Sequence, residues 1–330
     1  MTFHPGVLDL DCEAESERIS DAIRRDARAF RRRGAVLGLS GGIDSSTVAA
    51  LCARALGPAR VRGLLMCERD SADETLGLSS GVAAALGIDV EIEDITDTLE
   101  ALGCYRRRDE AIAMVVDGYG PDHKSKIVLP GVSDTAAYNV YSVVVEAPDG
   151  TVTRTRLTAD AYLGVVAAVN FKQRVRKTLE YHWADRLNYL VAGTPNRLEY
   201  DQGFFVKNGD GAADIKPIAH LYKTQVYAMA AHLGVPDDVC HRPPTTDTYT
   251  LEQSQDEFYF SLPYDQMDLC LWAKDHDVTP EEAADVVGIS AEQVRVVFAD
   301  IDTKRSTTAY LHARPRLVEP VASAQDRPAG

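Results

Sequence analysis

Residues 34–46 read Gly34-Ala-Val-Leu-Gly-Leu-Ser-Gly-Gly-Ile-Asp-Ser-Ser46, a short apolar run that leads into a turn of small residues. An apolar run of this length, at 35–39, is typical of a buried parallel strand. Apolar residues then repeat at helical spacing over 44–56, until Gly57-Pro58 ends them. Glycines in the turn let the backbone approach phosphate oxygens, and the free N–H groups that open the helix can donate to them. The stretch therefore predicts a strand, a phosphate-binding turn and a helix.

The composition is that of an ordinary enzyme. The 330 residues are 45% hydrophobic, enough to build the core of one large α/β domain with appendages or of two small domains. A formal charge of −15 argues against a nucleic-acid partner, since phosphate backbones need clustered cations. No apolar run approaches the roughly 18 residues that span a bilayer, and no signal peptide is recognisable, so we expect a cytoplasmic protein without a membrane partner. Six cysteines without a C-x-x-C pair disfavour a structural zinc.

Helices and strands alternate over the first hundred residues. We expect helices over 16–33, 44–56 and 72–86, and strands over 35–39, 60–66 and 88–93. Such alternation predicts an α/β fold, a doubly wound parallel sheet with helices on both faces.

After a helix expected near 95–117, the rhythm breaks. Apolar stretches at 127–130, 138–145 and 151–157, with Pro148-Asp-Gly150 between the last two, predict an inserted β-hairpin closed on Asp-Gly, within an insertion at about 103–160. A long helix over 160–186 and a strand over 187–192 resume the sheet pattern. Because ligands of open α/β sheets bind at the carboxyl ends of strands, Ser40 and Thr194 should lie on the same rim.

Four further motifs follow or precede that strand in a fixed order. They read Asn170-Phe-Lys-Gln-Arg-Val-Arg176, Gly193-Thr-Pro-Asn-Arg-Leu-Glu199, Gly203-Phe-Phe-Val-Lys-Asn-Gly-Asp-Gly-Ala-Ala-Asp214 and Leu221-Tyr-Lys-Thr-Gln225. Together with the S-G-G-x-D-S turn, which lacks the lysine of G-x-x-x-x-G-K-[ST] loops, they resemble the ammonia-dependent NAD synthetase family of ATP pyrophosphatases. The resemblance covers about 34–100 and 165–270 and implies an adenine nucleotide alpha hydrolase-like fold.

The resemblance also implies a reaction. Nicotinic acid adenine dinucleotide would attack ATP to form an acyl-adenylate and pyrophosphate, and ammonia would then displace AMP to give NAD. The charge that develops on the phosphates can be offset by backbone N–H groups of the turn, by Lys223 and by Mg²⁺ on Asp44 and Glu199. Asp210 matches the family position near the nitrogen nucleophile, and Lys207 would approach the acyl end of the substrate.

The site residues implied by the resemblance fall into four overlapping groups. The catalytic group is Asp44, Lys207, Asp210 and Lys223. The ATP-binding group is Leu39, Ser40, Gly41, Gly42, Ile43, Asp44, Ser45, Ser46, Thr194, Lys223 and Thr246. Glu257, which falls where the family carries an acidic pair, is a further candidate without an assigned role. The substrate-binding group is Asn170, Arg174, Arg176, Lys207, Asp210 and Asp214. The metal group is Asp44 and Glu199.

The resemblance leaves three functions open. The first is NAD synthesis. The second is an amide ligase of the same fold that acts on another carboxylate, which is favoured by the insertion and by the unusual Cys67-Glu-Arg-Asp-Ser71. The third is a non-catalytic nucleotide-binding protein. The family forms homodimers through the long helix. No fused glutaminase is recognisable, so free ammonia or a separate partner should supply the nitrogen. We expect a catalytic domain over 1–270 and a C-terminal helical extension over 271–330, in which 279–295 resembles a helix-turn-helix.

Overall fold

The computed structural model describes residues 3–71, 74–128, 141–242, 249–251, 259–260, 262–319 and 321. Its strands are β1 Ala35–Gly38, β2 Val61–Leu65, β3 Asp89–Ile92, β4 Lys124–Val128, β5 Ser142–Glu146, β6 Val152–Arg156 and β7 Leu190–Val191. Its helices are α1 Cys12–Ala29, α2 Ile43–Leu56, α3 Thr75–Leu86, α4 Thr96–Ala101, α5 Cys104–Ala113, α6 Ala159–Leu187, α7 Arg197–Gln202, α8 Lys223–His232, α9 Asp237–Cys240, α10 Tyr264–Asp275, α11 Pro280–Val287 and α12 Ala291–His312, with 3₁₀ turns at Pro5–Leu8 and Pro58–Arg60.

The central sheet is parallel, with the strand order β3-β2-β1-β7. The chain runs outward from β1 to β2 and β3, then returns to the other side of β1 as β7. The carboxyl ends of β1 and β7 therefore lie next to each other where the strand order reverses, which is where doubly wound sheets bind ligands.

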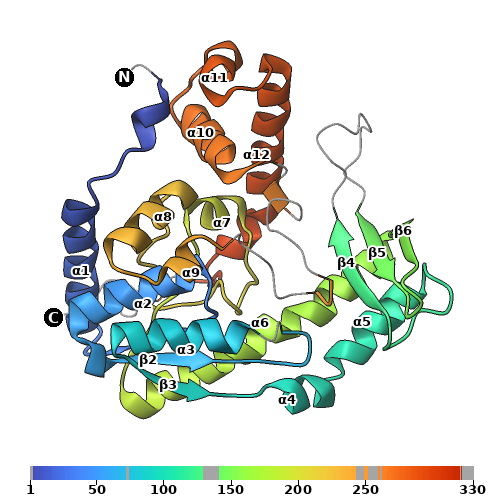
Figure 1. Cartoon of the computed structure of the whole chain (residues 1–330), viewed down its shortest axis with the longest axis horizontal. Coiled ribbons are helices and arrows are strands. Elements are labelled where there is room, and N and C mark those ends of the chain that lie inside the picture. The colour runs from blue at the N-terminus through green and yellow to red at the C-terminus, as the bar shows by residue number, and fades with distance from the viewer. Residues whose placement is uncertain are drawn as a thin grey trace.

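Helices cover both faces of this sheet, as the alternation predicts (Figure 1). Leu37 of β1 packs in one cluster with Leu51 of α2 and Val226 of α8. Its neighbour Val36, which points the other way, packs with Ala184 of α6 on the opposite face. Successive side chains of a strand point to opposite faces, so a strand apolar at every position is buried on both.

The insertion is larger than the predicted hairpin. The turn at 148–150 does join β5 to β6, with Gly150 at φ 85°, but β4 pairs with β5 to make a three-stranded antiparallel sheet. This sheet packs on Ile112 of α5 and Val165 of α6. The helix predicted over 95–117 is two helices, because the chain turns at Gly103, whose φ of 66° is left-handed.

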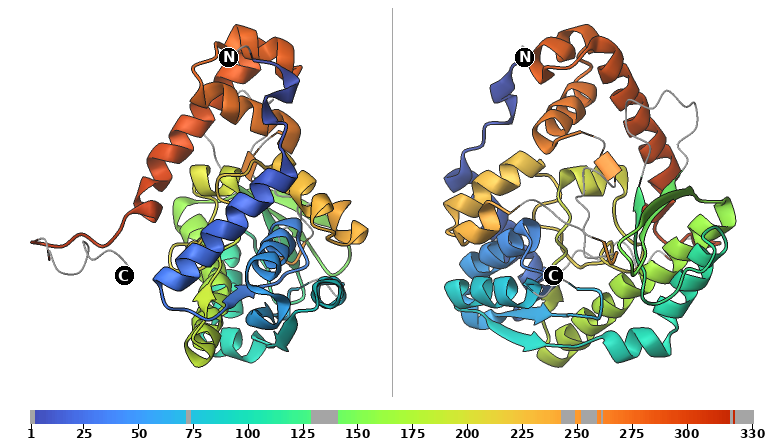
Figure 2. Two further views of the ribbon diagram at one scale, coloured as in Figure 1. Left: turned by 90° about the vertical axis from the view of Figure 1, so that its left-hand side faces the viewer. Right: turned by 45° about the vertical axis from the view of Figure 1, so that its right-hand side comes forward.

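Three C-terminal helices pack on one another, drawn in orange to red in Figure 2, and their apolar cluster includes Leu198 of α7. Trp272 of α10, Ala283 of α11 and Val294 of α12 lie in the apolar clusters of these helices. α11 ends at Gly288 and Ser290 caps α12, which is the helix pair that the sequence predicts. The expected domain division at 270 stays a prediction; α10 runs across that position. Within the described part of the chain, no helix is long and apolar enough to cross a membrane.

Candidate active site

A cavity of about 450 Å³ opens at the carboxyl ends of the parallel strands. Seven of the eight turn residues predicted to bind ATP line it, namely Leu39, Ser40, Gly41, Gly42, Ile43, Asp44 and Ser45. Gly41 has a φ of 73°, and a Cβ there would lie 2.9 Å from Cβ of Leu78, so only glycine fits this bend. Gly42 starts α2 without a side-chain cap, which leaves the first N–H groups of the helix open to an anion.

Serine hydroxyls hold the turn in shape. Ser45 Oγ donates to the Gly42 carbonyl at 3.1 Å and lies 3.1 Å from Ser40 Oγ. Ser46 Oγ donates to the same carbonyl at 2.8 Å, is fully buried and does not line the cavity. Ser46 thus stabilises the turn from its buried side, whereas Ser40 lies on the side that faces the cavity.

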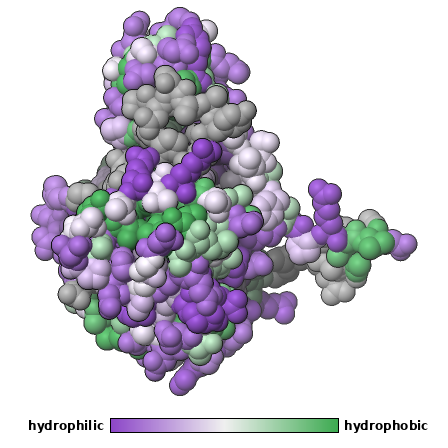
Figure 3. Space-filling model, turned by 90° about the vertical axis from the view of Figure 1, so that its right-hand side faces the viewer, coloured by the Kyte–Doolittle hydropathy of each residue, from purple (hydrophilic) through white to green (hydrophobic). Residues whose placement is uncertain are grey.

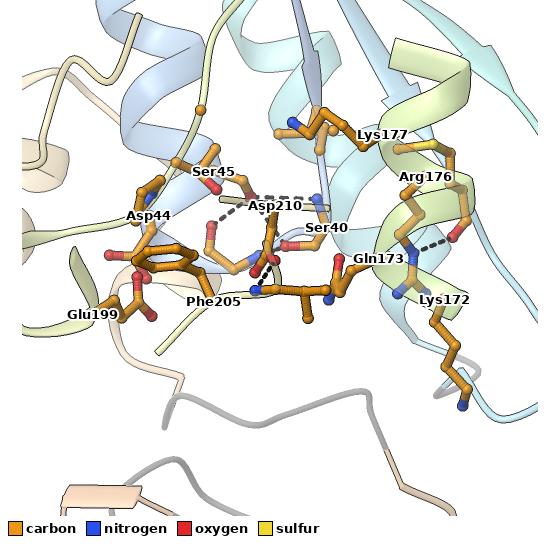
Figure 4. A pocket seen from close by; sticks show the side chains of 18 of the residues that line it. Ser40, Asp44, Ser45, Lys172, Gln173, Arg176, Lys177, Glu199, Phe205 and Asp210 are labelled. Carbon is orange, nitrogen blue, oxygen red and sulfur yellow. Dashed lines mark hydrogen bonds between the residues drawn. The ribbon is translucent and has the colours of Figure 1, made fainter. Parts of the chain in front are cut away.

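Asp44 joins three chain segments that are far apart in the sequence. Its Oδ1 accepts a hydrogen bond from Asn196 Nδ2 at 3.0 Å, and its Oδ2 accepts one from Lys223 Nζ. Asn196 also caps α7, where its backbone N–H donates to Glu199 Oε2 at 3.1 Å. The turn after β1, the start of α7 and the start of α8 therefore meet at one point, and Asp44 and Glu199 lie at the same end of the cavity (Figure 4).

The charges at this point do not balance. Burial and, second, the charge of Asp44 raise the pKa of Glu199 to about 8. Burial lowers the pKa of the fully buried Lys223, but the charges of Asp44 and Glu199 outweigh it and leave that pKa raised. One ammonium thus faces two carboxyl groups in a poorly solvated place, so a second cation there would stabilise the ionised form of Glu199.

The donor set suits magnesium. In the described residues there is no group of three or more His, Cys, Asp or Glu side chains that could hold a metal on their own. Magnesium commonly binds through one or two carboxylates together with substrate phosphates and water, which is what Asp44 and Glu199 beside an anion-binding turn offer. The residues present therefore fit Mg²⁺ brought in with a nucleotide.

Asp210 lines the cavity from the loop after α7. Its Oδ1 accepts from the Val206 N–H at 2.7 Å, and burial outweighs that hydrogen bond to raise its pKa (Figure 4). At Gly211 a Cβ would lie 2.3 Å from the Phe205 ring, so the glycine allows the loop to close over that ring. The Gly-Asp-Gly sequence is thus required by packing as well as by any chemistry of Asp210.

The long helix α6 presents Asn170 and Arg176 to the cavity. Arg176 Nε donates to the Met66 carbonyl at 3.4 Å. Arg174 points away: it is exposed, and its Nε donates to the Lys207 carbonyl at 3.3 Å. Residues two apart on a helix do not share a face, so this divergence is the one expected from their spacing.

Thr194 and Glu199 line the cavity, and the remaining predicted residues that the structure describes do not. Lys207 Nζ donates to the carbonyls of Tyr310 at 2.6 Å and Ala313 at 3.3 Å, at the end of α12. Asp214 is exposed and accepts from the Val191 N–H at 2.8 Å. Lys223 does not line the cavity, and its Nζ donates to Asp44, which does. Thr246 and Glu257 fall outside the described residues.

Sequence reasoning gave no role to several residues of the site. Asn196 was recognisable, since Asn three residues before Glu is a capping-box pattern. The buried pair of Lys177 and Glu180, with Nζ and Oε2 2.5 Å apart, lines the cavity and gave no signal except helical spacing. Four tyrosines, at 141, 162, 249 and 259, also line the cavity, and the sequence gave no reason to single them out. They come from the residue before β5, from α6 and from the chain beyond α9, so only the tertiary structure brings them to one cavity.

Comparison with known proteins supports the fold. Two solved structures share the fold: an NMN synthetase from Francisella tularensis (TM-score 0.65, 18% identity, 94% of this chain and 99% of that one) and an NH3-dependent NAD synthetase from Campylobacter jejuni in complex with nitrate (TM-score 0.62, 23% identity, 94% and 100%).

Sequence comparison is closer. An NH(3)-dependent NAD(+) synthetase of Rhizobium meliloti is 54% identical over 321 residues, 97% of this chain and 96% of its own. One from Methanocaldococcus jannaschii is 32% identical over 300 residues, 91% of this chain and 95% of its own. The profile of the NAD synthase family matches residues 15–118 and 139–307. The chain therefore belongs to the NAD synthase family.

Proposed function

We propose that this enzyme converts nicotinic acid adenine dinucleotide, ATP and ammonia to NAD, AMP and pyrophosphate. The relative from Rhizobium meliloti, which matches nearly the whole chain and carries the name of an NH(3)-dependent NAD(+) synthetase, supports the overall reaction. The observation that carries the mechanism is the junction of Asp44, Asn196, Glu199 and Lys223 beside the anion-binding turn.

In the first step the carboxylate of the dinucleotide attacks the α-phosphorus of ATP, and pyrophosphate leaves. The N–H groups that open α2 donate to the phosphate oxygens, and the Lys223 ammonium supplies charge that its burial keeps from being screened. Asp44 and Glu199 would hold Mg²⁺, which supplies positive charge next to the phosphates.

In the second step ammonia attacks the acyl carbon and AMP leaves with the electron pair of the broken acyl–oxygen bond. Ammonium must lose a proton before it can attack, and Asp210 would accept that proton. Its raised pKa makes Asp210 a better base than an exposed carboxylate. Asn170 and Arg176, which line the cavity, would contact the dinucleotide.

We further propose a homodimer that contacts the substrate through α6. Arg174 and Lys207, joined by a hydrogen bond, and Asp214 all lie outside the cavity of their own subunit, where a second subunit could bring substrate to them. Leu163 of α6 is 61% exposed. Figure 3, seen from the side of the inserted sheet, shows apolar residues gathered near the middle of that face.

The Leu163→Glu variant tests this interface by sedimentation. It should sediment as a monomer if the face is the interface, because a charge would then be buried between the subunits. An unchanged dimer would place the interface elsewhere.

The six cysteines are free, which supports a reducing, cytoplasmic location. Free ammonia is the expected nitrogen donor of the isolated chain.

Isotope incorporation tests the reaction itself. Purified protein given ATP, Mg²⁺, the dinucleotide and ¹⁵N-ammonium should form NAD that mass spectrometry finds one mass unit heavier, with one pyrophosphate released per NAD. Amide-labelled glutamine is the control and should give no label. Pyrophosphate release that does not depend on the dinucleotide, or that requires another acid, would instead support an amide ligase with a different substrate.

Two substitutions separate the proposed steps. Asp44→Asn should weaken the magnesium-dependent first step about 10- to 100-fold, because it removes a carboxylate ligand. Asp210→Asn should leave a rapid burst of pyrophosphate but slow steady NAD formation by about 10²- to 10⁴-fold, because the base is gone. Rapid-quench measurement of pyrophosphate and NAD distinguishes them. If Asp210→Asn turned over normally at saturating ammonium, Asp210 would not be the base.

The raised pKa of Glu199 predicts a pH dependence of stability. Without metal, the unfolded state loses this proton near pH 4.5 and the folded state only near pH 8, so ionisation of Glu199 destabilises the fold as pH rises between these values. Glu199→Gln cannot ionise and still accepts from the Asn196 N–H. In EDTA its midpoint of thermal unfolding should exceed that of the unsubstituted protein at pH 8.5, and the difference should vanish near pH 4.5. A difference of constant size would mean that Glu199 carries no such penalty.

A further inference from the structure

The short helix α7 carries Glu199 but is too short to fix its own place. It has six residues, and helices of this length do not persist on their own in water. Its position therefore depends on contacts with other elements. Leu198 of α7 is buried in one apolar cluster with Leu271 of α10 and Ile301 of α12, and residues near both ends of α7 contact the same helices.

Four side chains form a continuous chain of charges between α7 and those helices. At the start of α7, Arg197 Nη2 lies 2.7 Å from Asp275 Oδ2 of α10. The other oxygen of Asp275 accepts from Arg305 Nη2 of α12 at 2.6 Å. Near the end of α7, Asp201 takes two hydrogen bonds from Arg305, from Nε at 2.9 Å and from Nη2 at 2.8 Å. Glu199 lies between the two anchored residues.

The packing at the end of α7 adds a steric constraint. Gly203, with φ 73°, ends the helix directly against α12: a Cβ at Gly203 would lie 2.3 Å from Cβ of Thr308. Thr308 Oγ1 lies 3.3 Å from the Gln202 carbonyl. The backbone at the end of α7 thus packs directly against a side chain of α12, and no further atom would fit between them.

These contacts suit positioning better than they suit stability. Isolated surface ion pairs contribute little, but an Arg that grips a carboxylate with two nitrogens fixes geometry. The four side chains are all partly shielded, with exposures from 18% to 32%. A helix end that shifts by a fraction of its diameter would move the Glu199 carboxylate relative to Asp44.

We propose that Arg305 and Asp275 are positioning residues that clamp α7, so that the C-terminal helices set the place of Glu199 in the active site. The effect on catalysis rests on the function proposed above, whereas the clamp itself is a property of the fold. The C-terminal helices would thus affect the reaction through the position of Glu199, without any contact with substrate.

A matched pair of substitutions tests the clamp. Arg305→Gln breaks the chain, while Lys274→Gln removes a cation from the same helix group, where Lys274 Nζ pairs with Asp302 Oδ2 at 2.8 Å and so joins α10 to α12 without touching α7. Arg305→Gln should raise hydrogen–deuterium exchange in a peptide covering 196–203, weaken ATP binding in calorimetry with Mg²⁺ but not with EDTA, and lower kcat about tenfold. Lys274→Gln should change none of these.

Asp275→Asn is a milder second variant, because the amide oxygen can still accept from one of the two arginines while the amide nitrogen cannot accept from the other, and it should show the same pattern more weakly. Equal exchange at 196–203 in Arg305→Gln and Lys274→Gln would overturn the clamp. A rise in exchange without any loss of Mg²⁺-dependent ATP binding would overturn its link to Glu199. Exchange is read without turnover, so failure of the proposed reaction would leave this part of the test intact.

Discussion

The sharing of Asp44 between Asn196 and Lys223 is the interaction on which the rest of the site depends. One carboxylate joins the turn after β1, the start of α7 and the start of α8. Each of these segments brings one functional group: the open N–H groups of α2, the Glu199 carboxylate and the Lys223 ammonium. The parallel sheet makes the junction possible, because β1 and β7 are neighbours and their carboxyl ends open on one side.

The start of α8, which carries Lys223, is also held by the C-terminal helices. Asp268 of α10 accepts hydrogen bonds from the N–H groups of Lys223 at 3.2 Å and Thr224 at 2.7 Å, at the start of α8. Burial raises the pKa of Asp268 to about 6. The C-terminal helices thus reach the junction twice, through Asp268 at α8 and through Asp275 and Arg305 at α7. These three helices therefore contact the candidate site in the structure, although they are remote from the nucleotide motif in the sequence.

Local patterns in the sequence were enough for the elements around the turn, and the ordered motifs, through the family resemblance, were enough for the fold. The apolar run at 35–39 and the glycines after it predict β1 and the turn, since both depend on neighbours along the chain. The break at Gly103 and the third inserted strand were not predicted, because backbone angle and pairing partner are set by tertiary contacts. For the same reason the sequence could not place Lys207 at the end of α12, or bring Arg305 to Asp201.

The most direct test of the account is to locate a divalent ion at the junction. Crystals grown with Mn²⁺ and a non-hydrolysable ATP analogue should give an anomalous scattering peak between the carboxylates of Asp44 and Glu199, with phosphate oxygens completing the coordination. A peak bound by the phosphates alone, with Glu199 still hydrogen-bonded only to the Asn196 backbone, would contradict the claim that these two carboxylates form the electrostatic centre of the enzyme.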